Sequence, residues 1–280
     1  MKPGQESQTA IMVAKARAIA DGRTKAKAFH DPTAFALLPP EAQREVEAVR
    51  SGQAVTAAAK LERRLAERRG DVMAARTVAI DAAVREAAAP QVVILGAGLD
   101  GRAWRIPELG DVTVYEVDHP DSQRQKRARA SALTLAAREV RFVPVDFTVD
   151  DLDHALEAAG HQVGERTTWI WEGVVMYLTI QAIEQTLRIM RARSVARSRL
   201  IILYHAPALM LAIVGWVVKR VGEPLRSAFR PASMRALLAR HGFHVISDGD
   251  LPTHAAQTTP EIADRVRPMR HLRIAIAERE

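Results

Sequence analysis

The sequence predicts an α/β fold in which a mostly parallel β-sheet follows a helical N-terminal segment. From Val92 onward, short apolar runs rich in β-branched residues alternate with helical patterns. This alternation is typical of a parallel sheet covered by helices on both faces. The first apolar run leads directly into the glycine-rich loop GAGLDG at residues 96–101. Because ligands bind beyond the carboxyl ends of the strands in such sheets, we expect the functional residues directly after the strands.

Seven strands are expected, and the last two follow each other closely enough to favour an antiparallel edge strand. They are predicted at residues 91–95, 112–117, 140–145, 167–172, 199–204, 244–249 and 272–277. Helical patterns at residues 119–133, 149–160 and 180–194 follow the second, third and fourth of these strands.

Residues 1–88 are predicted to form a helical extension or cap. Ser7 is placed to cap the first helix, and the pairs Asp31-Pro32 and Pro39-Pro40 interrupt the helical pattern. Residues 89–280 would form the core that contains the sheet, with residues 206–240 as a helical insert at the substrate pocket.

The apolar stretch APALMLAIVGWVV, residues 206–218, is shorter than the roughly 20 residues that a membrane-spanning helix needs. We expect a buried or cleft-covering helix here, with a helix in the membrane interface as the alternative. The N-terminus lacks the apolar run of a signal peptide. A cytoplasmic protein without a transmembrane segment is therefore expected.

The chain carries a net charge of +7 and contains no cysteine. Such a charge is compatible with nucleic acid, an anionic membrane or an acidic small molecule as partner. The basic runs at residues 124–129 and 188–199 lack the interleaved aromatic residues of nucleic-acid-binding modules, so we predict solvated helix faces and no nucleic-acid partner. No carboxylate cluster accompanies His241 and His244, and no metal site is expected.

The loop GAGLDG matches the G-x-G-x-x-G pattern of dinucleotide-binding folds. Glycines such as Gly96 and Gly98 let a backbone turn tightly and approach a ligand closely. Asp118 follows Gly98 by 20 residues, the spacing at which a carboxylate accepts hydrogen bonds from a ribose diol. These features indicate a cofactor that contains a nucleoside.

Three observations weigh against NAD as that cofactor. The carboxylate of Asp100 would repel a pyrophosphate but tolerate the cationic sulfonium and ammonium groups of S-adenosyl-L-methionine. The helix after the loop ends early, at Pro107, so it is very short for a helix that should present its dipole to a pyrophosphate. No tyrosine is followed four residues later by lysine, which is the catalytic spacing of one large class of NAD-dependent enzymes. The chain could still use its loop as an NAD-dependent oxidoreductase, which remains the alternative.

The ends of later strands favour S-adenosyl-L-methionine. Asp146 and Phe147 end the third strand and could hold an adenine, although Asp146 could instead cap the following helix. Glu172 ends the fourth strand within an apolar run, where a carboxylate needs a partner.

Several stretches along the chain match one protein family. They are ARTVAID (75–81), VVILGAGLDGRAWR (92–105), VYEVDHP (114–120), VPVDF (143–147), WEGVVMYL (171–178) and GEP (222–224) before LLARHGF (237–243). Together with SQTA and FHDPTAFALL near the N-terminus, they resemble the leucine carboxyl methyltransferase family, including its O-methyltransferase relatives in polyketide synthesis. One departure is Gly101, where the bacterial branch usually carries threonine.

The resemblance implies a class I methyltransferase fold, a Rossmann-like seven-stranded sheet, with S-adenosyl-L-methionine as cofactor. It also implies roles for residues of this chain. Arg76 would neutralise the carboxylate of the cofactor, and Gly96 would make the close backbone approach. Asp118 would hold the ribose, and Asp146 and Phe147 would hold the adenine. Glu172 would complete the site, and Arg17 is the candidate for a basic N-terminal contact.

The expected function is therefore O-methyl transfer to a carboxylate or hydroxyl oxygen of a small, apolar acceptor. A carboxylate nucleophile needs no general base, whereas a hydroxyl does, so no catalytic residue is assigned. Tyr204 and His205 end the fifth strand and are predicted to bind substrate. His205 could act as a base toward a hydroxyl, or it could be a hydrogen-bonded structural histidine. A basic nucleic-acid-binding protein without enzymatic activity is the third hypothesis.

Overall fold

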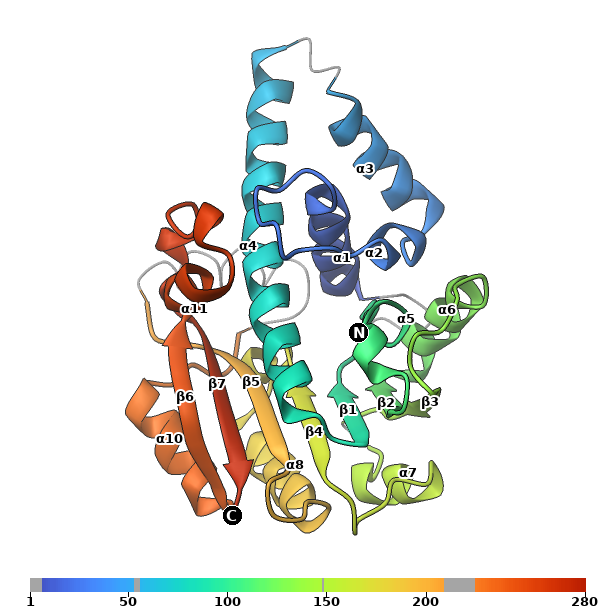
Figure 1. Ribbon diagram of the computed structural model, residues 1–280, viewed down its shortest axis with the longest axis vertical. Coiled ribbons are helices and arrows are strands. Elements are labelled where there is room, and N and C mark those ends of the chain that lie inside the picture. Colours follow the sequence, from blue (N-terminus) through green and yellow to red (C-terminus); the bar gives the residue numbers. More distant parts are fainter. Residues whose placement is uncertain (1–6, 53–55, 148, 209–224) are drawn as a thin grey trace.

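The computed structural model describes residues 7–52, 56–147, 149–208 and 225–280. Figure 1 shows a sheet with helices on both faces and a helical projection above it, formed by α3 and the first half of α4. The predicted α/β architecture with N-terminal helices is confirmed.

One seven-stranded sheet forms the centre, in the order β3-β2-β1-β4-β5-β7-β6. Its strands are β1 (Gln91–Leu95), β2 (Thr113–Asp118), β3 (Glu139–Pro144), β4 (Thr167–Trp171), β5 (Arg199–His205), β6 (Phe243–Asp250) and β7 (Leu272–Arg279). Strands β1 to β5 pair in parallel, whereas β7 runs antiparallel to both β5 and β6. All seven lie within two residues of the predicted bounds, and the antiparallel edge is confirmed.

The helices connect these strands and form the N-terminal segment. They are α1 (Gln8–Ala20), α2 (Thr33–Ala36), α3 (Pro40–Ser51), α4 (Ala57–Ala87), α5 (Arg102–Arg105), α6 (Pro120–Ala130), α7 (Leu152–Ala158), α8 (Ile180–Ala192), α10 (Pro231–Arg240) and α11 (Leu251–Thr258), with 3₁₀ turns η1 (Pro107–Leu109), η2 (Val175–Tyr177), η3 (Pro260–Ile262) and η4 (Arg267–Met269). Ser7 caps α1 as expected, because its Oγ accepts a hydrogen bond from the Ala10 amide at 3.2 Å.

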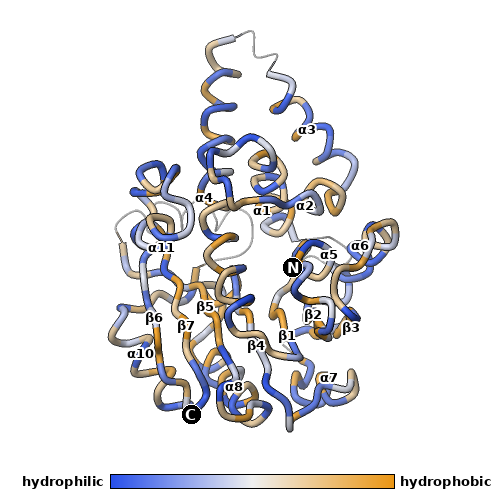
Figure 2. Tube along the Cα trace, in the orientation of Figure 1, coloured by the Kyte–Doolittle hydropathy of each residue, from blue (hydrophilic) through white to orange (hydrophobic). Residues whose placement is uncertain are grey.

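The alternation of side chains along the strands divides the core into two layers. One face packs against α4 and α11, with Ile94 and Ile201 at its centre, and the other packs against α7, α8 and α10, with Trp169 and Trp171 fully buried. Figure 2 shows apolar residues concentrated on the strands, while α3 is largely polar. Because both faces are covered, the inner strands β1, β4 and β5 are buried along nearly their whole length rather than on alternate residues.

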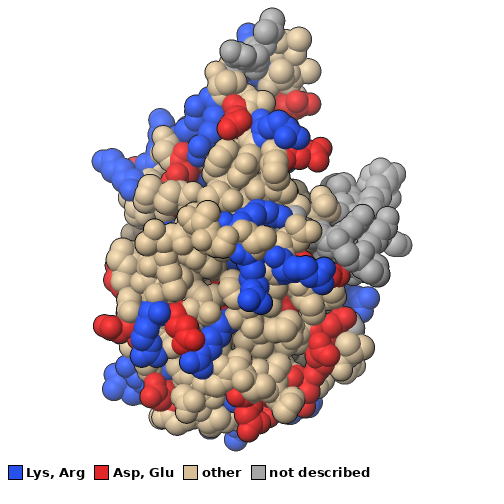
Figure 3. All heavy atoms as spheres, turned by 90° about the vertical axis from the view of Figure 1, so that its right-hand side faces the viewer, with Lys and Arg blue, Asp and Glu red and all other residues tan. Residues whose placement is uncertain are grey.

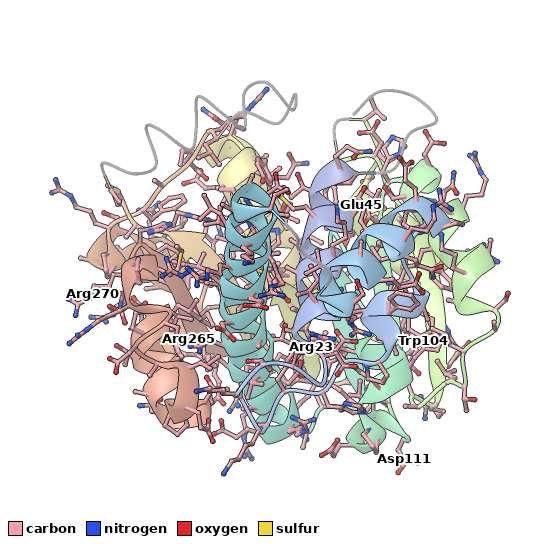
Figure 4. The ribbon with its side chains drawn as sticks, turned by 90° about the horizontal axis from the view of Figure 1, so that it is seen from above. Arg23, Glu45, Trp104, Asp111, Arg265 and Arg270 are labelled. Carbon is pink, nitrogen blue, oxygen red and sulfur yellow. The ribbon has the colours of Figure 1, made fainter. Side chains whose placement is uncertain are left out.

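The helix α4 joins the N-terminal segment to the sheet. Its Asp71 is 3% exposed and accepts hydrogen bonds from Thr24 Oγ1 at 2.8 Å and Arg265 Nη1 at 2.7 Å. Figure 4 shows α4 between the segment that carries Arg23 and the segment that carries Arg265. One buried carboxylate thus links chain segments from both ends of the sequence.

The apolar stretch predicted as a buried helix at residues 206–218 lies largely outside the described residues. Of the predicted insert 206–240, the described part includes α10, whose Met234, Leu237 and Leu238 pack into the sheet core. No helix among the described ranges has the length and apolar character needed to cross a membrane. The domain bounds and the cytoplasmic location remain predictions.

Candidate active site

A cavity of about 610 Å³ opens at the carboxyl ends of β1, β2, β3 and β4. The structure brings eight of the predicted site residues to its lining: Arg17, Arg76, Gly96, Gly98, Asp118, Asp146, Phe147 and Glu172. Residues from α1, including Ala10 and Val13, and from the start of α8 complete the wall. Residues that lie as far apart as Arg17 and Glu172 in the sequence therefore share one cavity.

The loop after β1 adopts the backbone conformation that its glycines permit. Gly96 and Gly98 have φ values of 66° and 48°, a region that residues with a Cβ rarely occupy. A Cβ on Gly96 would lie 2.2 Å from Val174 Cγ2, so no side chain fits there. The amides of Gly96 and Ala97 both donate to the carbonyl of Val117, at 2.8 and 3.0 Å. The loop is thereby tied to the end of β2, where Asp118 stands.

The carboxylate of Asp118 is oriented by two backbone amides. Its Oδ2 accepts a hydrogen bond from the Gly98 amide, and its Oδ1 accepts one from the His119 amide at 2.6 Å. Burial raises the pKa of Asp118, and these two hydrogen bonds work in the opposite direction. Each carboxylate oxygen keeps a second lone pair for a ligand, so the group can accept hydrogen bonds from a diol in the cavity.

Asp146 and Phe147 follow β3 on the neighbouring part of the rim. His119 Nε2 lies 3.7 Å from Asp146 Oδ2, and the side chain of Asp146 is 34% exposed. The N-cap of α7 is Asp151, which accepts from the Asp153 amide at 2.8 Å. Capping α7 is therefore not the role of Asp146, and its carboxylate remains at the cavity beside an aromatic ring.

The carboxylate of Glu172 has two arginine partners, which meets the expectation that it needs one. Its Oε1 accepts from Arg76 Nε at 2.5 Å, and its Oε2 lies 2.8 Å from Arg102 Nη1. Burial alone would raise the pKa of Glu172, but Arg76 and Arg102 lower it to about 2. The side chains of Glu172 and Arg76 are 13% and 10% exposed, so this ion pair forms part of the cavity wall.

Arg102 is one of the lining residues that the sequence did not reveal. Besides Glu172, it contacts Asp100, and its Nε donates to Asp81 Oδ1 at 2.8 Å. Although burial would raise it, the guanidinium of Arg102 holds the pKa of Asp100 well below its usual range. Asp100 Oδ1 also accepts from the Arg102 amide at 2.8 Å. The Asp100 carboxylate of the loop is thus paired with Arg102 and has a structural role. The helix α5 that follows the loop is as short as predicted.

Arg17 lines the cavity but is held by protein groups. Its Nη1 donates to Asp31 Oδ2 at 2.9 Å and its Nη2 to the Leu99 carbonyl at 2.6 Å. These bonds fix α1 against the loop after β1. A contact from Arg17 to a ligand stays a prediction, and a role in closing the cavity wall accounts for the bonds that the structure shows.

Tyr204 and His205 are not among the lining residues of this cavity. Tyr204 is fully buried in the sheet core, and its hydroxyl lies 2.9 Å from Asp248 Oδ2 and 3.0 Å from Arg273 Nε. This cluster joins β5, β6 and β7 and accounts for Tyr204 without a substrate. His205 is half-buried, and within the described ranges neither of its ring nitrogens has a hydrogen-bond partner.

The basic runs are solvated only in part: five of their arginines are exposed as predicted, whereas three other cations are buried, which corrects that part of the sequence interpretation. Lys126 is 1% exposed and lies 2.6 Å from Glu116. Arg193 and Arg199 are 5% and 7% exposed and pair with acidic residues of other elements. Figure 3 shows basic and acidic side chains interspersed on the face it presents. Long-range ion pairing, which a local pattern does not encode, draws these cations inward.

Among the parts of the chain that the structure describes, no group of three or more His, Asp or Glu residues could hold a metal ion. The polar groups that line the cavity include the backbone of the glycine loop, the strand-end carboxylates and the guanidinium of Arg76.

Comparisons with known proteins point to one family. A family model described as leucine carboxyl methyltransferase matches residues 10–191. A protein of Mycobacterium sp. (strain JLS), named "Putative S-adenosyl-L-methionine-dependent methyltransferase", is 36% identical over 219 residues, which cover 78% of this chain and 72% of that protein. A protein of the same name from Mycobacteroides abscessus is 36% identical over 212 residues, which cover 69% of this chain and 62% of that protein.

Two solved structures share the fold. A protein from Thermobifida fusca YX superposes with a TM-score of 0.58 and 14% identity, over 100% of this chain and 96% of that one. A DUF574 family protein from Streptomyces avermitilis MA-4680 gives a TM-score of 0.56 and 15% identity, over 95% and 97%.

Proposed function

Because the chain belongs to the leucine carboxyl methyltransferase family, we propose that it transfers the methyl group of S-adenosyl-L-methionine to an oxygen atom of a small acceptor. One observation carries this proposal. Carboxylates at the end of β2 and after β3 and β4 line one cavity together with the two glycines after β1 that have positive φ. This set of groups suits a ligand with a nucleoside at one end and a charged amino acid at the other.

Different residues of the cavity would contact different parts of the cofactor. Asp118, fixed by two amides, would accept hydrogen bonds from the ribose hydroxyls. Asp146 and Phe147 would hold the adenine, the first by accepting from its amino group and the second by packing. Gly96 and Gly98 would let the backbone approach without side chains in the way.

Arg76 would bind the carboxylate of the cofactor. Its Nε is occupied by Glu172, which fixes the guanidinium plane at the cavity wall. A guanidinium presents donors in a fixed fork that matches a carboxylate. Glu172 therefore positions Arg76, and Arg102 in turn positions Glu172.

Bound S-adenosyl-L-methionine supplies a methyl group that is already activated on a sulfonium sulfur. The task of the protein is then to align the acceptor oxygen with that group and to exclude water. The helix α1 contributes to this exclusion, since Ala10, Val13 and Arg17 close one side of the cavity.

Isothermal titration calorimetry with S-adenosyl-L-methionine, S-adenosylhomocysteine and NAD tests the cofactor. We expect binding of the first two and none of NAD; binding of NAD alone would support an oxidoreductase instead. A mass-spectrometric screen for methyl transfer to carboxylic acids, phenols and alcohols then tests the reaction. Gain of one methyl group on oxygen is the expected result, and methylation only of nitrogen or carbon acceptors would contradict the proposal.

A further inference from the structure

Arg226 lines the cavity and is exposed. The other arginines among the described lining residues are buried, and each pairs with a carboxylate of the chain; they are Arg17, Arg76 and Arg102. Within the described ranges, the guanidinium of Arg226 forms no hydrogen bond or ion pair. Its N–H donors can therefore pair with a ligand of the cavity.

The short segment that carries Arg226 is tied to the ends of two strands. The Arg226 amide donates to the Met176 carbonyl at 2.7 Å, and the Ser227 hydroxyl donates to the Val175 carbonyl at 2.7 Å, both in the turn η2 that follows β4. Further along, the Phe229 amide donates to the carbonyl of the last residue of β5 at 2.9 Å. These bonds fix the backbone of Arg226 on the β4 and β5 side of the cavity.

Sheet topology separates Arg226 from the residues proposed to hold the adenosine. The strand order at this edge is β3-β2-β1-β4-β5, with Asp146 after β3 and Asp118 at the end of β2. Neighbouring strands lie about 4.8 Å apart, so the ends of β2 and β5 are about 14 Å apart. On the Arg226 side, Val174 and Leu178 line the cavity with apolar side chains. A cofactor that runs from Asp146 toward β4 would leave this side to the acceptor.

We infer that Arg226 binds a carboxylate of the acceptor that is separate from the oxygen receiving the methyl group. This inference rests on the methyl transfer proposed above and narrows the acceptor to an organic anion with an apolar body. A guanidinium presents its donors in a fork that matches a carboxylate and binds it through two parallel hydrogen bonds. Val174 and Leu178 would contact the apolar body. The net charge of +7 favours the approach of such an anion.

The bound carboxylate is an anchoring group and not the nucleophile. Its oxygens donate electron density to two charge-assisted hydrogen bonds with Arg226, which weakens them as attacking atoms. Fixing a group away from the reacting oxygen aligns that oxygen with the methyl carbon, which lowers the entropic cost of the reaction. Arg226 is therefore a specificity-determining residue, and its loss should affect the choice of acceptor without affecting the binding of the cofactor.

Two ligands of matched shape test the inference. The carboxylate of 6-hydroxy-2-naphthoate is charged, whereas 6-hydroxy-2-naphthamide replaces it with a neutral amide. Calorimetry on the protein loaded with S-adenosylhomocysteine should show that the wild type binds the acid roughly 10- to 100-fold more tightly than the amide. In Arg226→Gln, this preference should disappear through weaker binding of the acid, with the affinities for the amide and for S-adenosylhomocysteine unchanged. Arg230→Gln, at an exposed position of the same segment that does not line the cavity, is the matched control and should keep the preference of the wild type.

The opposite results have distinct meanings. Equal affinity of the wild type for acid and amide, binding of neither, or a preference that survives in Arg226→Gln would remove Arg226 from acceptor binding. Weaker binding of S-adenosylhomocysteine by Arg226→Gln would assign the guanidinium to the cofactor and overturn the inference. Formation of the methyl ester of the acid, detected by mass spectrometry, would make the carboxylate the nucleophile and contradict its anchoring role. Failure of the wild type to bind S-adenosylhomocysteine would instead count against the proposed function itself.

Discussion

The side chain of Thr33 occupies the space that a Cβ on Gly101 would need. Such an atom would lie 1.8 Å from Thr33 Oγ1 and 2.8 Å from Thr33 Cβ. Gly101 has a φ of −115°, so its backbone conformation is open to other residues and the restriction is steric. The threonine expected on this loop in the bacterial branch is absent, and a threonine from the N-terminal segment packs against the loop instead. The third glycine of the G-x-G-x-x-G pattern is therefore explained by its tertiary contact with Thr33.

Gly101→Ala should destabilise the protein by about 1–3 kcal/mol, because the added methyl group overlaps Thr33. Thr33→Ala removes the nearer of the two clashing atoms. In the double variant we therefore expect a loss smaller than the sum of the single losses, by about 0.5 kcal/mol or more. Urea unfolding of the four proteins measures this coupling, and strictly additive losses would show that the two residues do not compete for space.

Asp118→Asn tests the cofactor site. The amide removes the charge and places N–H donors next to backbone amides that already donate. Hydrogen bonds to a charged group contribute about 1.5–3 kcal/mol, so the affinity for S-adenosylhomocysteine should fall roughly 10- to 100-fold. Asp111→Asn, at an exposed position before β2, is the matched control and should bind as the wild type does. Calorimetry compares the three proteins; unchanged binding by Asp118→Asn would remove Asp118 from the site.

The ion pair of Glu172 and Arg76 predicts a second coupling. Glu172→Gln leaves Arg76 without its counter-charge and removes one of the ion pairs of Arg102. We therefore expect a loss of about 3–5 kcal/mol in the free energy of unfolding. Arg76→Met with Glu172→Gln removes both charges and should be less destabilising than Glu172→Gln alone. Thermal or urea unfolding measures the difference. A double variant at least as unstable as the single one would mean that Arg76 is stable without a counter-charge.

The strands and the strand-end carboxylates could be predicted because both are local patterns. Runs such as QVVIL at residues 91–95 carry their own signal, and topology alone brings Asp118, Asp146 and Glu172 to one edge. The arginine partners could not be predicted, since Arg76 lies 96 residues from Glu172 in the sequence and no spacing links them. The burial of Lys126 could not be predicted for the same reason: the pattern of its helix is that of a solvated face, and only the contact of α6 with Glu116 of β2 in the folded chain buries this side chain.

His161 should make the protein sensitive to acid. It is 4% exposed, and its ring stands between Tyr115 and Trp169 at centroid distances of 5.4 and 5.5 Å. Its buried Nδ1 has no hydrogen-bond partner in the part of the chain that the structure describes. Burial, together with the charge of Arg193, lowers the pKa of His161 from 6.5 to about 4. The folded protein therefore binds this proton less readily than the unfolded chain. The neutral ring contributes stability that is fully present above pH 6.5 and is lost as the pH falls toward 4.

At about 1.4 kcal/mol per pH unit, the loss from this single group reaches roughly 3 kcal/mol at the acid end. His161→Gln should flatten the dependence of the free energy of unfolding on pH across this range, even where it lowers stability at neutral pH. His154→Gln, on the exposed side of α7, is the control and should keep the slope of the wild type. Urea unfolding at a series of pH values measures the slopes. An unchanged slope in His161→Gln would place the acid-sensitive group elsewhere, since the wild-type slope would then owe nothing to the buried ring.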